Sequence, residues 1–183
     1  MNFTKKETPI DGLFILEPKL FDDSRGYFFE SYKSSNFKEM GINENIVQSN
    51  QSRSIRGVVR GLHYQNGEFA QAKLVRCLSG KIYDVAVDVR KNSKTFGHHF
   101  GINLSDENNL MLYIPKGFAH GFSVLSEHAN VFYDVFGGEY NKESEAGIRF
   151  NDPELRIDWK IESPIVSEKD IELPFFKDIN SGF

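Results

Sequence analysis

The sequence predicts an all-β fold of the jelly-roll type, a sandwich or barrel of strands with a few short helices. About ten short runs have the alternating or apolar pattern of strands, and Gly, Asn and Asp punctuate them. Phe is unusually frequent, with 17 residues, which favours strands around an aromatic core. The chain has 183 residues, enough for a sizeable core, and shows no internal repeat or linker. We therefore expect one jelly-roll domain over residues 1–183.

The predicted strands follow one another along most of the chain. They cover residues 13–18, 26–32, 45–52, 57–65, 72–78, 81–89, 96–104, 110–115, 117–125 and 129–136. The best helix candidate is "SSNFKEM" at residues 34–40, where a Ser can serve as N-cap and Gly41 as the stop.

The strand at residues 57–65 carries two polar side chains in an otherwise apolar run, Arg60 and His63. Strict alternation would place them on opposite faces of the sheet. A bulge at Gly61 would instead turn both toward one cavity. The pattern alone leaves both arrangements open.

Alternation is clearest in the strand "KIYDVAVDV" at residues 81–89. One face carries Tyr83, Val85, Val87 and Val89, and the other carries Asp84, Ala86 and Asp88. The two carboxylates would lie about 13 Å apart, too far for a glycosidase pair, which needs roughly 5–10 Å. Either the polar face points into the barrel and Asp84 is an interior carboxylate, or both carboxylates are solvated.

Composition excludes several classes of function. The net charge is −4, the pI is about 5.8, and no cluster of Lys or Arg is long enough for a nucleic-acid surface. No apolar run approaches membrane-spanning length, and the N-terminus lacks the apolar region of a signal peptide. The single cysteine, Cys77, excludes an internal disulfide and fits a small buried hydrophobe. We expect a cytoplasmic protein.

A jelly roll invites a metal-site interpretation, because cupins often hold a metal ion with several His residues. The strand "GLHYQ" has one His where metal-binding cupins have H-x-H, although "PKGFAH" supplies His120 in the second cupin motif. His98 and His99 are adjacent in their strand, so they face opposite sides and cannot chelate together. Too few convergent ligands remain, and we expect no metal and no cofactor.

Without a metal, proton transfer is the remaining chemistry. His63 is the natural base, since imidazole titrates near neutral pH, and Asp170 is a candidate carboxylate partner for it. Tyr133 could exchange a proton on the other side of a ligand, and Lys73 could stabilise an oxyanion. Each of these residues also has an ordinary structural interpretation as a hydrogen-bonded or solvated side chain.

Several long stretches, taken in order, resemble the dTDP-4-dehydrorhamnose 3,5-epimerase family over nearly the whole chain. They are "LEPKLFDDSRGYFFESY", "VQSNQS", "GVVRGLHYQ", "AKLVRCLSGKIYDVAVDVRKNSKTFG", "INLSDENN", "YIPKGFAHGFSVLSE" and "VSEKDIELP". The resemblance implies a cupin-like jelly-roll homodimer whose N-terminal strands cross into the partner subunit. It also implies an isomerase of dTDP-rhamnose biosynthesis with a metal-free site inside the barrel.

The family's substrate is a nucleoside-diphosphate-linked 4-keto-6-deoxyhexose, whose ketone acidifies the C3 and C5 protons. By resemblance, His63 is the base with Asp170 as its partner, Tyr133 is the acid, and Lys73 stabilises the enolate. Arg60 would contact the diphosphate or the sugar of the same ligand. This requires Arg60 and His63 to converge, so we expect a local irregularity at Gly61–Leu62.

The resemblance also implies a set of substrate-binding residues. They are Arg25, Glu30, Gln48 and Asn50 for the nucleotide and sugar, Phe21 with Phe28 or Phe29 lining that region, and His120 and Asp84 near the sugar.

One stretch departs from the family's pattern. Where the family has paired tyrosines, one of which stacks on thymine, this chain reads "DVFGGEYNKESEAG" with the single Tyr140. Either Tyr140 stacks on the base from a shifted loop, or the base differs. The alternatives are a C3-only or C5-only epimerase, an enzyme for a GDP- or CDP-linked sugar or heptose, and a non-catalytic carbohydrate-binding jelly roll.

Overall fold

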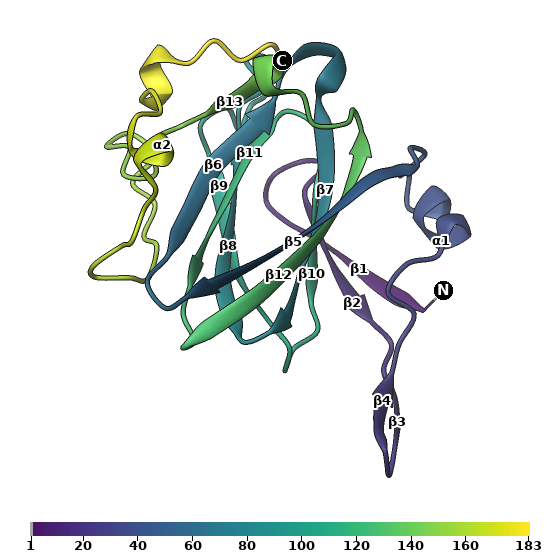
Figure 1. Ribbon diagram of the computed structural model, residues 1–183. Coiled ribbons are helices and arrows are strands. Elements are labelled where there is room, and N and C mark those ends of the chain that lie inside the picture. The colour runs from purple at the N-terminus through teal and green to yellow at the C-terminus, as the bar shows by residue number, and fades with distance from the viewer. Residues whose placement is uncertain (1) are drawn as a thin grey trace.

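The computed structural model describes residues 2–183 and contains two antiparallel sheets that face each other across a barrel (Figure 1). The six-stranded sheet has the order β1 (Phe3–Glu7), β2 (Phe14–Pro18), β10 (Met111–Ile114), β7 (Gln71–Ser79), β12 (His128–Gly137), β5 (Ile46–Ile55). The five-stranded sheet has the order β13 (Glu145–Gly147), β6 (Val59–Gln65), β11 (Phe118–Val124), β8 (Lys81–Asp88), β9 (His99–Ser105). The predicted all-β jelly roll is confirmed.

A short hairpin of β3 (Phe21–Asp23) and β4 (Gly26–Phe28) projects away from the barrel (Figure 1). The predicted strand at 26–32 was therefore too long, since it ends at Phe28. Helix α1 (Ser34–Glu39) follows, and Gly41 terminates it in the left-handed conformation as expected. Its N-cap is Lys33 rather than a Ser, and no side chain caps it.

The C-terminal segment contains a helix that the sequence did not predict, α2 (Glu168–Ile171). The remaining short helices are the 3₁₀ turns η1 (Gly67–Phe69), η2 (Lys142–Ser144) and η3 (Phe176–Asp178). Within residues 2–183 no helix has the length and apolar character needed to cross a membrane.

Apolar side chains pack on both faces of each sheet. Between the sheets lies an apolar cluster from both, which includes Val75, Cys77, Ile82, Ala86 and Val131. Outside the five-stranded sheet, the C-terminal segment packs Trp159 and Leu155 against β6, β8 and β11. Outside the six-stranded sheet, Phe37 of α1 packs against Phe136 of β12. The polar side chains that enter the barrel therefore stand out against an apolar interior.

The sequence left open whether the face of β8 that carries Asp84 points into the barrel or into solvent, and the structure decides between the two. Ile82 and Ala86 join the cluster between the sheets, while Val85 and Val87 face the C-terminal segment. Asp84 shares the inner face with Ile82 and Ala86, and both Asp84 and Asp88 are fully buried. Asp84 is thus an interior carboxylate, and the solvated alternative is excluded.

Strand β6 contains the expected irregularity at Gly61. His63 pairs with His120 of β11, but Arg60 pairs with Phe122, so Gly61 and Leu62 of β6 lie opposite the single residue Gly121 of β11. Gly61 has φ +120°, and a Cβ there would lie 2.6 Å from Gly121 Cα. Only glycine fits this backbone. The extra residue lets Val59 keep its outward direction while Arg60 turns to the same side as His63.

Gly61→Ala should destabilise the protein by about 3 kcal/mol, because it combines a positive φ with a clash against β11. Gly26→Ala is a matched control: it has φ +126° but nothing within 4 Å of the added Cβ. The control should lose only about 1 kcal/mol. Urea unfolding of both variants measures this difference. Equal losses would show that contact with β11 does not require glycine.

Candidate active site

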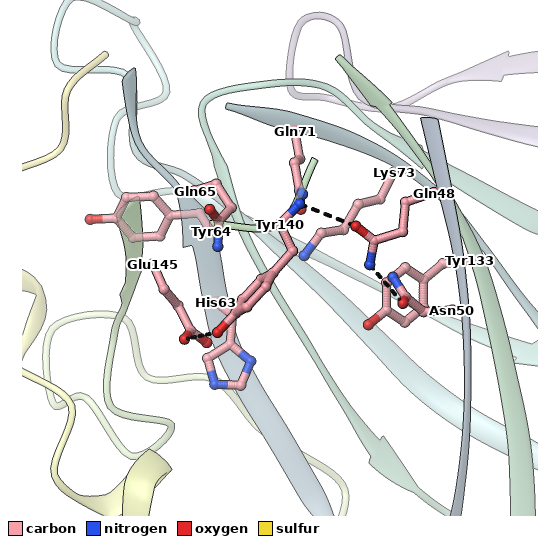
Figure 2. A pocket seen from close by; sticks show the side chains of 10 residues that line it. All are labelled: Gln48, Asn50, His63, Tyr64, Gln65, Gln71, Lys73, Tyr133, Tyr140 and Glu145. Carbon is pink, nitrogen blue, oxygen red and sulfur yellow. Dashed lines mark hydrogen bonds between the residues drawn. The ribbon is translucent and has the colours of Figure 1, made fainter. Parts of the chain in front are cut away.

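Two adjoining hollows open between the sheets, and they share His63, Lys73 and Tyr133. The outer hollow has a volume of about 310 Å³ (Figure 2) and is lined by Gln48, Asn50, His63, Tyr64, Gln65, Gln71, Lys73, Tyr133, Tyr140 and Glu145. The inner hollow has a volume of about 150 Å³ and is lined by Ser52, Arg60, His63, Lys73, His120, Gly121, Phe122 and Tyr133. Together they form one cavity large enough for a small polar ligand.

His63 is held by a carboxylate on the side away from the strand. Its Nε2 lies 2.7 Å from Asp170 Oδ1, and the other oxygen of Asp170 accepts a hydrogen bond from the Gly61 N–H at 3.2 Å. Burial raises the pKa of Asp170, but the bonds from His63, Gly61 and Ser167 outweigh it and hold that pKa below its usual value. An ionised Asp170 favours the neutral tautomer of His63 that carries its proton on Nε2, and in that tautomer the Nδ1 lone pair can accept a proton.

Helix α2 places Asp170 there. Ser167 caps its N-terminus by accepting a hydrogen bond from the Asp170 N–H at 3.2 Å. The same carboxylate thus ties together α2, the bulge at Gly61 and the imidazole of His63.

Lys73 and Tyr133 enter the cavity from the opposite sheet, on neighbouring strands β7 and β12. The Lys73 ammonium lies 5.7 Å from the centre of the Tyr133 ring. Burial lowers the pKa of Lys73 to about 8, although the nearby carboxylates of Asp84 and Glu145 act to raise it. Burial also raises the pKa of Tyr133, against the opposing effect of Arg60, so its hydroxyl keeps its proton.

A second His–Asp pair lies deeper. His120 Nε2 is 2.8 Å from Asp84 Oδ1, and both side chains are buried. His120 lines the inner hollow, but Asp84 stands behind it and lines neither hollow. The structure therefore brings His120 to the cavity wall and places Asp84 one layer farther from a ligand.

Arg60 reaches the inner hollow from the bulge and donates a hydrogen bond from Nε to Ser54 Oγ at 3.0 Å. Its terminal guanidinium nitrogens form no hydrogen bond with other side chains within residues 2–183. Gln48 and Asn50 line the outer hollow from β5, and Gln48 Nε2 donates to Asn50 Oδ1 at 2.9 Å. These side chains give the cavity a mixed lining of donors and acceptors.

Tyr140 reaches the cavity from the loop whose sequence departs from the family pattern. Its N–H donates to Gln48 Oε1 at 3.1 Å, and its hydroxyl donates to Glu145 Oε2 at 3.0 Å. Figure 2 shows its ring extending across the cavity toward His63 and Glu145. The hydrogen bond to Glu145 raises the pKa of the Tyr140 hydroxyl.

Several residues of the cavity wall were not predicted from the sequence. Gln65 and Gln71 could have been found by alternation, since each lies two positions from a predicted site residue, His63 and Lys73. Glu145 had no such signal, because it begins a three-residue strand after an irregular loop. Its carboxylate also forms an ion pair with Lys169 at 2.7 Å.

The predicted residues of the N-terminal region do not lie at this cavity. Phe21, Arg25 and Phe28 line a separate hollow of about 200 Å³ on the projecting hairpin, where Arg25 pairs with Asp23. Glu30 accepts a hydrogen bond from Asn36 Nδ2 of α1 at 3.1 Å.

No group of three or more His, Cys, Asp or Glu side chains within residues 2–183 is arranged to hold a metal ion. The cavity presents proton donors, proton acceptors and fixed charges.

The sequence profile of dTDP-4-dehydrorhamnose 3,5-epimerase matches residues 7–178 of this chain. The chain belongs to this epimerase family. The epimerase of Shigella flexneri is 48% identical over 179 residues, which cover 97% of each chain. These matches confirm the resemblance seen in the sequence motifs.

Solved structures of the family superpose closely on this epimerase-family chain. The dTDP-4-dehydrorhamnose 3,5-epimerase of Elizabethkingia anophelis has a TM-score of 0.94 and 52% identity, with 98% of this chain and 100% of that chain covered. The Legionella pneumophila dTDP-6-deoxy-D-glucose-3,5-epimerase, solved with dTDP-4-keto-L-rhamnose, has a TM-score of 0.93 and 46% identity, with 97% and 95% covered.

Proposed function

We propose that this chain inverts C3 and C5 of a dTDP-linked 4-keto-6-deoxyhexose and so converts dTDP-4-dehydro-6-deoxyglucose into dTDP-4-dehydrorhamnose. The observation that carries the proposal is the placement of base and acid on opposite sheets. His63 lies on β6 of the five-stranded sheet, and Tyr133 lies on β12 of the six-stranded sheet. Both line the same cavity, so a sugar ring between them has one group on each face.

The chemistry follows from the 4-ketone. His63 Nδ1 takes the proton from C3 or C5, and the bonding electrons move onto O4 to form an enolate. Asp170 holds the imidazole and stabilises the imidazolium. The Lys73 ammonium stabilises the negative oxygen. Tyr133 then donates its hydroxyl proton to the same carbon from the opposite face, which inverts the centre, and solvent reprotonates Tyr133 and takes the proton from His63.

The nucleotide end of the substrate accounts for the remaining polar lining. Arg60 suits the diphosphate, because its guanidinium is permanently charged and offers paired donors. Tyr140, Gln48 and Asn50 lie at the outer hollow, where an aromatic ring can stack on thymine. A Bacillus anthracis relative, 43% identical with a TM-score of 0.92, was solved with TDP bound.

The projecting hairpin supports the proposal that the protein is a homodimer. Phe21, Tyr27 and Phe28 are exposed on it, and Arg25 stands at its tip. Exposed aromatic side chains on an extended arm are unfavourable unless another surface covers them. We infer that the arm, with Glu30 near its base, completes the cavity of a partner subunit. We further infer that each subunit is a single domain acting in the cytoplasm.

Turnover in D₂O tests the reaction directly. Wild-type enzyme should place one solvent deuteron at C3 and one at C5 of the sugar, as NMR and mass spectrometry of the product would show. His63→Ala should abolish both exchanges, because no base remains. Tyr133→Phe should still exchange protons but lose inversion at one or both carbons.

Three outcomes would contradict parts of the proposal. Deuterium at one carbon alone would identify a single-centre epimerase. Binding of the substrate without any exchange would identify a non-catalytic binding protein. Full inversion of both carbons by Tyr133→Phe would remove Tyr133 as the acid.

Mixing two inactive variants tests the shared site. Arg25→Ala and His63→Ala dimers, dissociated and reassembled together, should form mixed dimers with one intact site each. Random reassembly should restore about one quarter of the wild-type activity, since half of the dimers are mixed and each has one of two sites. Each variant reassembled alone is the control. No recovery in reassembled mixed dimers would place Arg25 and His63 in sites of the same subunit.

A further inference from the structure

The inner pair of His120 and Asp84 contains a buried carboxylate oxygen that contact with substrate does not explain. Asp84 Oδ1 is bonded to His120, but its Oδ2 is buried and finds no hydrogen-bond partner within residues 2–183. A buried carboxylate oxygen without a partner is costly, and such groups in native structures call for an explanation. Because Asp84 lines neither hollow, the explanation lies in its neighbours and not in a direct contact with the sugar.

Among the neighbours of Asp84, Lys73 is the one whose charged form needs a nearby anion, because its ammonium is buried. Its strand neighbours Val75 and Cys77 belong to the cluster between the sheets, and so do Ile82 and Ala86 on either side of Asp84. Both side chains thus point into the same interior from opposite sheets. Asp84 is the larger of the two carboxylate influences that favour the charged form of Lys73, and Glu145 is the other.

We propose that Asp84 is a positioning residue which keeps Lys73 charged and fixes the orientation of His120, without touching the substrate. The proposal rests on the function proposed above, because it explains how the enolate-stabilising cation stays charged in a buried site. The carboxylate has two effects: Oδ1 bonds His120, and the negative charge of the group acts on the Lys73 ammonium through space, without a hydrogen bond.

The other charged or titratable groups around Lys73 do not replace this anion. The cavity wall facing Lys73 carries Arg60 and His63 on β6, His120 on β11, Tyr133 on β12 and Glu145 on β13. Arg60 is a cation, and Tyr133 keeps its proton at neutral pH. Glu145 is already paired with Lys169 and Tyr140. Asp84 is therefore the carboxylate that can balance Lys73 from inside the barrel.

The direction of the pH effect follows from which form of Lys73 is active. The ammonium stabilises the enolate, so kcat/KM should fall as the pH rises through the Lys73 pKa of about 8. Asp84→Asn removes a charge that raises this pKa. The alkaline limb should then move to lower pH by about one unit, which means roughly a tenfold loss of kcat/KM above pH 8 and a smaller loss at acid pH.

The decisive experiment is an NMR titration of the Lys73 side chain in ligand-free protein, compared with the pH profile of kcat/KM. Asp84→Asn should lower both midpoints together. Asp134→Asn is the matched control, because Asp134 bonds Ser49 on the outer face of the same barrel, and it should move neither. Unchanged Lys73 titration in Asp84→Asn, with a loss of activity that is equal at all pH values, would overturn the proposal.

A second measurement does not require Asp84→Asn to fold. In otherwise wild-type protein, the ¹³C shift of the Asp84 carboxyl should follow the Lys73 midpoint, and Lys73→Met should remove that step. An Asp84 carboxyl shift that shows no step at the Lys73 midpoint would overturn the proposal. Both titrations are made without substrate, so they remain informative even if the protein fails to epimerise the sugar.

Discussion

The active cavity depends on one extra residue in strand β6. In a regular strand Arg60 and His63, three residues apart, would face opposite sides of the sheet, and only one of them could enter the barrel. The glycine at position 61 accepts a positive φ and a close approach to Gly121, so both polar side chains enter the same cavity. The N–H at the bulge also donates to Asp170, the carboxylate that orients His63. The backbone irregularity therefore places both the Arg60 guanidinium and the His63–Asp170 pair at the cavity.

The rest of the site is a set of buried charges that the barrel has to balance. His63 and His120 each have an aspartate partner, and the two pairs lie on one sheet. Lys73 faces them from the other sheet, in surroundings that make its charge costly. A buried cation stabilises negative charge that develops beside it more strongly than a solvated cation does. The interior carboxylate Asp84 makes this arrangement possible by keeping Lys73 charged before the substrate arrives.

The sequence was sufficient for the fold class and for most of the cavity. Alternation in β8 grouped the correct residues on each face. The family resemblance, which required Arg60 and His63 to converge, predicted the irregularity at Gly61–Leu62. Periodicity could not say which face of β8 was the inner one, because both faces of this sheet are covered. Glu145 escaped prediction because its strand has only three residues, too few for a pattern. The proposed roles of Arg25, Phe21 and Phe28 require a second subunit, so the contacts of one chain cannot test them.

A crystal structure with a dTDP-linked 6-deoxyhexose reduced at C4, which cannot form an enolate, would show how base and acid meet the sugar. We expect the sugar ring to lie between the two sheets, with His63 Nδ1 within about 3.5 Å of C3 or C5 on one face and the Tyr133 hydroxyl on the other. Arg60 should contact the same ligand at its diphosphate or sugar. A sugar that meets His63 and Tyr133 on the same face, or a ligand that leaves Arg60 without a contact, would show that the proposed arrangement of base, acid and binding cation is wrong.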